Sequence, residues 1–351
     1  MSFRHLLVIN LREIGDVLVS TPVFSALREA FPAARLTALV PAKTVEMLAG
    51  NPDVDHVLPL KRGWEHGGGR VSGWMKDARF LWSLRHLGVD GVIDLTANDR
   101  SALLAYASGA PVRIARRRMK GFTGRRRLYT REVAVDSQRP MAAQLVQILE
   151  GLDLHPEAER FPLRLTVPPE DQERVDRLLE GGGPFIHFHP LSRLPVKCWS
   201  DAGMAALMDE SLRRGFTPVV TAAPDPWEMD KVRAILALTQ GERCLNLSGQ
   251  LTLKQLAGVT RRARLFVGVD SAPMHMAAAM ATPVLALFGP SDERLWGPWR
   301  VPHRVVSRNL PCRLPCHNKK GCQTRECIRD LPIPDALVAL SALLDDLPHS
   351  R

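Results

Sequence analysis

Residues 266–291 read FVGVDSAPMHMAAAMATPVLALFGPS, and this stretch decides the fold class. The apolar run at residues 265–269 predicts a buried strand, residues 272–280 predict a helix, and residues 283–288 predict a second strand. Pro273 suits the first turn of that helix, where a backbone N–H has no partner inside the helix. A strand, a short helix and a strand in succession indicate a parallel βαβ unit.

The same alternation extends over the rest of the chain. In the N-terminal half, strands are predicted at residues 5–11, 35–40, 56–60, 89–95 and 112–115. Helices are predicted there at residues 15–31, 44–49, 74–87, 101–108 and 141–152. A second set of strands is predicted at residues 184–188, 217–221 and 245–247, ahead of the stretch quoted above. Strands that alternate with helices indicate parallel sheets covered by helices on both faces.

A segment rich in proline and glycine, residues 154–183, separates the two sets and predicts an interdomain connection. We therefore expect an α/β chain of two Rossmann-like domains with a central cleft between them. The expected N-terminal domain is residues 1–165 and the expected C-terminal domain is residues 166–351. The last helix is a candidate for packing back on the N-terminal domain.

Composition excludes several classes of protein. The chain has 351 residues, of which 45% are hydrophobic and 24% are charged, as is ordinary for a soluble globular protein. These values exclude a disordered chain, and the 27 prolines exclude a long coiled coil. The longest uncharged stretch, residues 271–291, is interrupted by three prolines, which favours a buried βα unit over a membrane span. With six cysteines and no signal-peptide pattern at the start, we expect a cytoplasmic protein.

Positive charge is concentrated in one segment. The formal net charge is +10, and residues 100–139 hold eleven Lys or Arg against two acidic residues. Such a patch favours an anionic partner such as nucleic acid, a phosphorylated glycan or acidic lipid head groups. A solvated basic loop that keeps the chain soluble explains the pattern equally well.

The absence of two nucleotide-binding motifs turns attention to other loops. Neither domain contains G-x-G-x-x-G or G-x-x-x-x-G-K-[ST], which argues against an ordinary dehydrogenase or a P-loop nucleotidase. Asp16 follows the first predicted strand and begins the first long helix. A carboxylate there is suited to act as a general base, but it also stabilises the positive end of the helix. Position alone favours this second interpretation.

In the C-terminal half, Ser192 and Lys197 follow the strand at residues 184–188, where a hydroxyl and an ammonium group suit a phosphate. A surface loop with no ligand explains them as well. Asp270 and Ser271 precede the helix at residues 272–280, whose first N–H groups form an anion site. Either residue is also a suitable helix cap.

An acidic residue after the second strand of a Rossmann domain commonly binds ribose hydroxyls. Glu228 and Asp225 are the candidates here, and each is equally suited to cap the following helix. His275 lies inside the predicted helix at residues 272–280, where a buried and satisfied histidine is as good an interpretation as a ligand-binding one.

Two stretches together resemble the two ends of glycosyltransferase family 9, the ADP-heptose:lipopolysaccharide heptosyltransferases. They are IGDVLVSTPVFSALREAFP at residues 14–32 and the quoted stretch at residues 266–291. A third, HPLSRLPVKCW at residues 189–199, resembles the lipopolysaccharide heptosyltransferase III branch. The resemblance covers nearly the whole chain in the same order. It implies a GT-B fold, an inverting mechanism, ADP-L-glycero-D-manno-heptose as donor, the lipopolysaccharide inner core as acceptor, and no cofactor or metal required for catalysis.

The resemblance also implies roles for individual residues. Asp16 matches the proposed catalytic base of the family, and Glu228 lies near its ribose-binding glutamate. Ser192 and Lys197 match diphosphate-binding positions. The positions that match the donor-binding loop are Asp270, Ser271, Ala272 and Pro273, and His275 matches a histidine common in the same motif. The family usually has glycine where Ala272 stands, so this chain departs from the pattern at that turn.

Two clusters lie outside these motifs. We predict that Arg116, Arg117, Arg118 and Lys120 bind the phosphorylated acceptor and the anionic inner-membrane surface, which makes the protein peripheral at that membrane. The second cluster is Cys312, Cys316, Cys322 and Cys327. Four thiolates are able to hold a structural zinc, and this interpretation stays open, but the spacing is not that of a zinc ribbon, and free or structural thiols are favoured.

Two alternative functions remain open. One is transfer of a sugar from another nucleotide-sugar donor. The other is nucleic-acid binding through the basic segment, which is disfavoured because no helix-turn-helix, RRM, KH or zinc-finger pattern occurs in the sequence.

Overall fold

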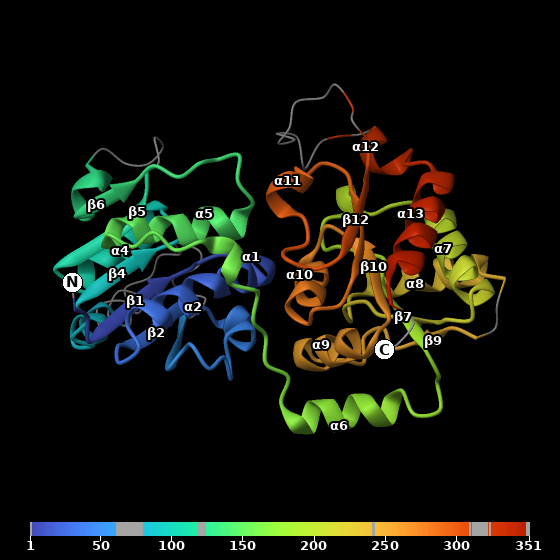
Figure 1. Ribbon diagram of the computed structural model, residues 1–351, viewed down its shortest axis with the longest axis horizontal. Coiled ribbons are helices and arrows are strands. Elements are labelled where there is room, and N and C mark those ends of the chain that lie inside the picture. Colours follow the sequence, from blue (N-terminus) through green and yellow to red (C-terminus); the bar gives the residue numbers. More distant parts are fainter. Residues whose placement is uncertain are drawn as a thin grey trace. The chain divides into compact units, whose positions relative to one another are not determined.

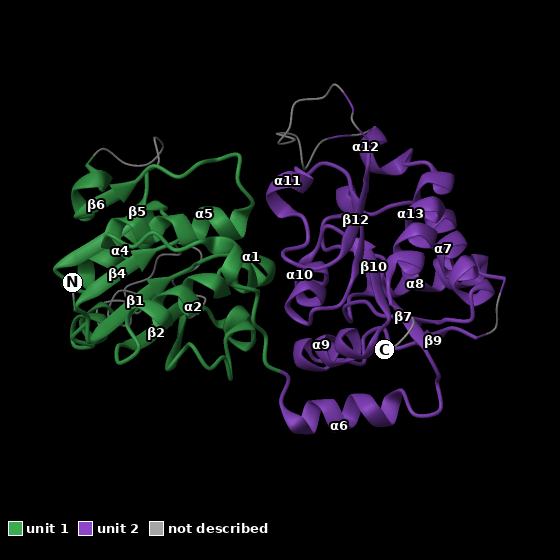
Figure 2. Cartoon of the chain, viewed as in Figure 1, with its two compact units in different colours: residues 1–166 green, residues 167–351 purple. Residues whose placement is uncertain are grey.

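The computed structural model describes residues 2–60, 80–117, 124–240, 243–308, 310, 322 and 324–348. The chain forms two compact units, Met1–Thr166 and Val167–Arg351 (Figure 2). The division between the units lies one residue beyond the boundary expected from the sequence. In the described residues, no helix combines the length and the apolar character needed to span a membrane.

Unit 1 is built on a parallel sheet of six strands in the order β3-β2-β1-β4-β5-β6 (Figure 1). Its strands are β1 (His5–Ile9), β2 (Arg35–Pro41), β3 (His56–Leu60), β4 (Gly91–Asp94), β5 (Val112–Arg116) and β6 (Arg131–Val133). Its α-helices are α1 (Ile14–Val19), α2 (Thr21–Ala30), α4 (Asp99–Ala107) and α5 (Met141–Gln147), and residues 80–85 are also helical. Short 3-10 helices are η1 (Ala42–Met47), η3 (Arg125–Leu128), η4 (Ile148–Leu152) and η5 (Ala158–Arg160). Strands β1 and β4 are buried along their whole length, as the continuous apolar runs predict for a sheet covered on both faces.

The first long helix is divided in two, which corrects the single helix expected at residues 15–31. α1 ends at Val19 and α2 begins at Thr21. Pro22 has no N–H to donate to the preceding turn, so a continuous helix is not possible there. The hydroxyls of Ser20 and Thr21 donate to the carbonyl oxygens of Val17 and Leu18 instead. The break ends the helix that carries Asp16 after six residues.

Unit 2 repeats the plan with a parallel sheet in the order β12-β11-β10-β7-β8-β9. Its strands are β7 (Phe185–His189), β8 (Thr217–Val220), β9 (Leu245–Asn246), β10 (Leu265–Val269), β11 (Val284–Phe288) and β12 (His303–Ser307). Its helices are α6 (Pro169–Leu178), α7 (Asp201–Arg213), α8 (Pro226–Leu238), α9 (Leu253–Arg262), α10 (Ala272–Ala279), α11 (Glu293–Trp296), α12 (Glu326–Arg329) and α13 (Ile333–Asp346), with the 3-10 helix η6 (Pro195–Lys197). The two units therefore confirm the predicted α/β class with two Rossmann-like sheets.

The sequence did not predict β6 and β12, which form one edge of each sheet, because both carry charged and exposed residues in place of an apolar run. The last helix, α13, packs on α7 and β12 within unit 2. Its buried face, which includes Leu340 and Leu343, joins the core of that unit. Its packing back on the N-terminal domain stays a prediction.

Candidate active site

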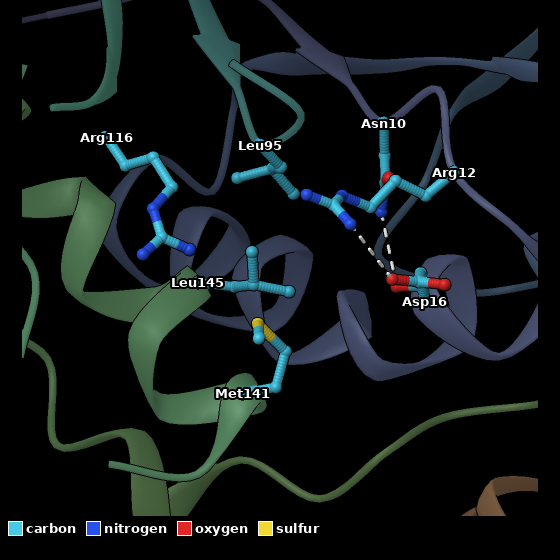
Figure 3. A pocket seen from close by; sticks show the side chains of 7 residues that line it. All are labelled: Asn10, Arg12, Asp16, Leu95, Arg116, Met141 and Leu145. Atoms are coloured by element: carbon cyan, nitrogen blue, oxygen red, sulfur yellow. Dashed lines mark hydrogen bonds and ion pairs between the residues drawn. The ribbon is translucent and has the colours of Figure 1, made fainter. Parts of the chain in front are cut away.

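The order of strands in unit 1 reverses between β1 and β4. From β1 the sheet grows toward β2 and β3, and from β4 it grows the other way toward β5 and β6. In open α/β sheets, ligands bind at such a switch point beyond the carboxyl ends of the strands. A pocket lies at this point (Figure 3). It is lined by Asn10, Arg12, Asp16, Leu95, Arg116, Met141 and Leu145.

Asp16 lies in the first turn of α1 and lines this pocket. The residue at the N-cap is Glu13, so Asp16 does not cap the helix. The Oδ1 atom of Asp16 lies 3.6 Å from an Nη1 atom of Arg12, and the Asp16 side chain keeps 22% of its surface exposed. The carboxylate is therefore held near a cation and remains accessible to a ligand.

Asn10, which follows β1, and Arg116, the last residue of β5, face the same pocket (Figure 3). The side-chain amide of Asn10 donates to the backbone carbonyl of Asp16 (3.2 Å), while its Oδ1 atom is buried without a partner in the described residues. A buried acceptor that lines a pocket suits a ligand hydroxyl. Leu95, with Met141 and Leu145 of α5, forms the apolar part of the wall.

Only part of the predicted acceptor cluster lies at this pocket. Arg116 lines it, whereas Arg117 is exposed and donates its backbone N–H to the carbonyl of Val133. Arg118 and Lys120 lie outside the described residues. The sequence did not single out Asn10 or Arg12, although the spacing of Arg12 and Asp16, four residues apart across the start of a helix, is typical of an ion pair.

A buried carboxylate holds the loop after β4 in place. Oδ1 of Asp94, which is fully buried, accepts hydrogen bonds from the N–H groups of Thr96 and Ala97, both at 2.9 Å. The Tyr129 hydroxyl donates to its Oδ2 atom at 2.6 Å. Burial raises the pKa of Asp94 above its ordinary value. Since Thr96 Oγ1 also accepts from the N–H of Leu11, this network joins the two loops that frame the pocket.

In unit 2 the strand order reverses between β7 and β10. An ion pair crosses this switch point: Nζ of Lys197, on η6 after β7, lies 2.5 Å from Oδ2 of Asp270, which follows β10. Their side chains are only 17% and 7% exposed. The structure thus brings together two of the predicted donor-binding residues from positions 73 residues apart in the chain.

Asp270 leads into the start of α10. Neither Asp270 nor Ser271 caps this helix through its side chain, because Asp270 pairs with Lys197 and the Ser271 hydroxyl donates to the carbonyl of Val269. Ala272 begins the helix and Pro273 lies in its first turn. The start of the helix, next to the ammonium group of Lys197, is suited to bind an anion.

His275 is buried in the same helix, with Nδ1 lacking a partner in the described residues. Burial lowers its pKa to about 4, so the ring is neutral near pH 7. The ring packs edge-on against Trp296 at a centroid distance of 6.4 Å. A neutral imidazole in this position contributes shape and a hydrogen-bonding atom, but no charge.

Ser192 lies in the loop between β7 and η6, and it is nearly buried. Its N–H donates to Sγ of Cys198, and its hydroxyl accepts from the N–H of Leu194. Burial raises the pKa of Cys198 to about 11, so its thiol is protonated near pH 7. These bonds fold the loop tightly enough to present Lys197 to the end of β10.

The two acidic candidates after β8 have separate roles. Asp225 is the N-cap of α8 and accepts from the N–H groups of Trp227 and Glu228. Glu228 turns back to accept from the N–H of Ala223 at 2.9 Å, and burial raises its pKa. The structure thus assigns the cap to Asp225, and Glu228, in the first turn of α8, remains the ribose candidate.

The cysteine cluster is only partly described. Cys312 and Cys316 lie outside the described residues, whereas Cys322 and Cys327 are within them. In the part of the chain that the structure describes, no group of three or more His, Cys, Asp or Glu side chains is placed to hold a metal ion.

Comparison with known proteins places the chain in a family. The sequence pattern of "Glycosyltransferase family 9 (heptosyltransferase)" matches residues 78–326, more than half of the chain. The chain belongs to glycosyltransferase family 9. It is therefore a glycosyltransferase, and the two sheets with their switch points are those expected for the GT-B fold.

Individual members of the family are similar over nearly their whole length. Lipopolysaccharide heptosyltransferase 3 of Escherichia coli strain K12 is 27% identical over 349 residues, which cover 97% of this glycosyltransferase and 98% of the relative. A family 9 glycosyl transferase from Veillonella parvula has the same fold, with a TM-score of 0.85, 23% identity and 99% coverage of both chains. The E. coli heptosyltransferase WaaC, solved with ADP-2-deoxy-2-fluoro heptose, superimposes with a TM-score of 0.72 at 17% identity over 97% of this chain and 99% of that one.

Proposed function

We propose that this glycosyltransferase moves heptose from ADP-L-glycero-D-manno-heptose to the lipopolysaccharide inner core, with inversion at the anomeric carbon. The observation that carries the proposal is the carboxylate of Asp16 in a pocket at the switch point of unit 1. Family membership and the similarity to lipopolysaccharide heptosyltransferase 3 support heptose as the transferred sugar. In this proposal unit 1 supplies the base and binds the acceptor, and unit 2 holds the donor.

An inverting transfer needs one base on the acceptor side of the anomeric carbon. The acceptor hydroxyl attacks that carbon while its proton passes to the Asp16 carboxylate, and the bond from the carbon to the ADP oxygen breaks. The Arg12 guanidinium lies 3.6 Å from Asp16 and orients the carboxylate in the pocket. Oδ1 of Asn10 is buried without a partner in the described residues, and in the proposal it becomes accessible to a second hydroxyl when the acceptor binds.

The departing ADP carries negative charge that unit 2 is equipped to stabilise. Lys197 supplies a point charge, and the first turn of α10 at Ala272 and Pro273 supplies the positive end of a helix. In the described structure Lys197 is paired with Asp270, so the diphosphate competes with this carboxylate for the ammonium group. Ser192, on the same loop as Lys197, supplies a hydroxyl, and Glu228 remains the candidate for the ribose.

The basic segment supports an acidic acceptor. Arg116 lines the acceptor pocket beside Asp16, and Arg117 is exposed on the next position. In the proposal, Arg116 binds a phosphate of the inner core, while Arg117, with Arg118 and Lys120, contacts the anionic surface of the inner membrane. The protein then works on the cytoplasmic side of that membrane, where it meets a lipid-linked acceptor.

The first test is the replacement Asp16→Asn, assayed with ADP-heptose and truncated core acceptors. Loss of the base should lower turnover by about 10²-fold to 10⁴-fold, while the dissociation constant of ADP stays unchanged. Glu13→Gln is the matched control, because Glu13 lies on the same loop and pairs with Lys43 outside the pocket. An Asp16→Asn protein with normal turnover contradicts the proposal.

The two alternatives give different outcomes in a thermal-shift experiment. Stabilisation by ADP supports the proposal, whereas stabilisation by another nucleoside diphosphate in preference to ADP indicates a different donor. Stabilisation by an oligonucleotide alone indicates a nucleic-acid-binding protein. Membership of a glycosyltransferase family is the finding that sets this last alternative below the others.

A further inference from the structure

Two histidines on β7 form a buried hydrogen-bonded chain that the proposed mechanism does not use. Nδ1 of His187 lies 3.0 Å from Oγ1 of Thr260 on α9, and its Nε2 lies 2.7 Å from Oγ1 of Thr221. The same Thr221 oxygen lies 2.9 Å from Nδ1 of His189. The hydrogen bonds therefore run from Thr260 on α9, through His187 on β7, to Thr221, the residue that follows β8.

The direction of these hydrogen bonds follows from the Thr260 end. The Thr260 hydroxyl donates to the carbonyl of Leu256 at 2.8 Å, so toward His187 it is an acceptor and Nδ1 of His187 carries a proton. His187 is fully buried, and burial lowers its pKa well below 6.5, so the ring is neutral. A neutral imidazole with a proton on Nδ1 has an unprotonated Nε2, which is a hydrogen-bond acceptor.

The bare Nε2 of His187 needs a donor, and the Thr221 hydroxyl supplies it at 2.7 Å. The alternative acceptor for that hydroxyl, the carbonyl of Phe188, is farther away at 3.4 Å. With its single hydrogen used, Thr221 is an acceptor toward His189, so Nδ1 of His189 carries the proton. Burial lowers the pKa of His189 to about 4, so its Nε2 is bare near pH 7.

His189 is the last residue of β7, at the carboxyl end of the strand that borders the switch point of unit 2. It pairs in register with Gly268 of β10, two residues before Asp270. The residue keeps 7% of its surface exposed, and within the described residues its ring is hydrogen-bonded through Nδ1 to Thr221. The series of hydrogen bonds thus ends at His189, whose Nε2 carries a lone pair, at the edge where ligands of open parallel sheets bind.

We infer that His189 is a specificity-determining residue of the donor site, whose Nε2 accepts a hydrogen bond from a hydroxyl of the nucleotide-sugar. The inference rests on the proposed function, because it assumes that unit 2 holds this donor. A lone pair repels phosphate oxygens and attracts hydroxyl groups. The diphosphate is therefore directed toward Lys197 and the start of α10, and a ribose or sugar hydroxyl is directed toward His189.

The test is NMR of the full chain with ¹⁵N-labelled histidine, where two-bond couplings between ring nitrogens and carbon-bound protons identify the tautomer. We expect the Nδ1–H tautomer at His189 without ligand, and a change in its Nε2 resonance on saturation with donor. A change with ADP alone assigns the ribose hydroxyl, and a change only with ADP-heptose assigns a sugar hydroxyl.

The affinity of variants for the donor tests the role of these hydrogen bonds. Thr221→Val keeps the shape of the side chain but removes the proton that sets the tautomer, and should weaken donor binding about tenfold. His189→Leu should weaken it at least as much, whereas His189→Gln, which keeps an acceptor on a side chain of similar length, should recover part of the loss. Thr217→Val, at the start of the strand that Thr221 follows, is the matched control and should bind normally.

Two results overturn the inference while the proposed function stands. One is an Nε2–H tautomer at His189. The other is a His189 resonance that does not respond to saturating ADP or ADP-heptose, although calorimetry shows that both bind. A wild-type chain that binds neither ligand overturns the proposed function and this inference together.

Discussion

Nζ of Lys197 and Oδ2 of Asp270 lie 2.5 Å apart and join the ends of β7 and β10 across the switch point of the second sheet. The pair is almost buried, so the two charges depend on each other for compensation. A diphosphate that binds Lys197 changes this balance, which links donor binding to the packing of the sheet. The stability of the sheet and the affinity for ADP are both measurable in a variant of Lys197.

Replacement of Lys197 by Met should lower the free energy of unfolding by about 1–3 kcal/mol, because the Asp270 carboxylate loses its buried cation. The dissociation constant of ADP should rise about tenfold to hundredfold, since the diphosphate loses a point charge. Urea unfolding and titration calorimetry measure the two effects. The double variant with Asp270→Asn should regain part of the stability but not the affinity.

The control for this variant is Arg304→Gln. Arg304 pairs with Asp346, and both side chains are exposed, at 43% and 63%. Loss of such a pair should change the free energy of unfolding by less than about 1 kcal/mol. If Lys197→Met unfolds and binds ADP as the wild type does, the ion pair has neither role.

Because histidines are buried in unit 2, we expect the stability of this unit to fall in acid. The pKa of His275 is lowered to about 4 by burial, from an ordinary value of 6.5. Between these values the unfolded chain binds more protons than the folded chain, so the free energy of unfolding falls as the pH is lowered through this window. The complete effect of one such histidine, reached near the lower value, is on the order of 3 kcal/mol.

His275→Leu should therefore flatten the dependence of stability on pH, measured by urea unfolding at several values from neutral to mildly acidic pH. His303→Leu is the matched control, because His303 is exposed on the edge strand β12. An unchanged pH dependence in the His275 variant would show that protonation of this ring does not oppose folding.

The proposed role of Arg116 is to bind a phosphate of the acceptor. Arg116→Gln should raise KM for a phosphorylated acceptor about tenfold, because a charge-assisted hydrogen bond to the phosphate is lost. The dissociation constant of ADP should not change, and an acceptor without the phosphate should be used equally well by both proteins. Steady-state kinetics with the two acceptors measures this difference.

Arg139→Gln is the control for a cation of the same basic segment, since Arg139 pairs with Glu159 outside the pocket. Charge reversal at Arg116, Arg117 and Arg118 together should also reduce binding to anionic liposomes. Acceptor KM and liposome binding that both remain at wild-type values contradict the role of this segment.

Much of the fold was predictable because local patterns determine it. The apolar runs at residues 265–269 and 283–288 became β10 and β11, and Pro273 lies in the first turn of α10 as expected. The break at Pro22 was also readable in the sequence, but the helical spacing on both sides of it predicted one helix. The edge strands β6 and β12 had no apolar run to mark them.

The sequence by itself determined two α/β units and the placement of Asp16, Lys197 and Asp270 near the ends of strands, because strand and helix periodicity is a property of neighbouring residues. Its motifs also indicated the family. Only the tertiary structure decided which loops meet. Arg116 reaches the pocket of Asp16 because β5 follows β4 beside β1, and Thr221 links two histidines because β8 lies beside β7. Such contacts depend on the spatial order of the strands, which no local pattern encodes.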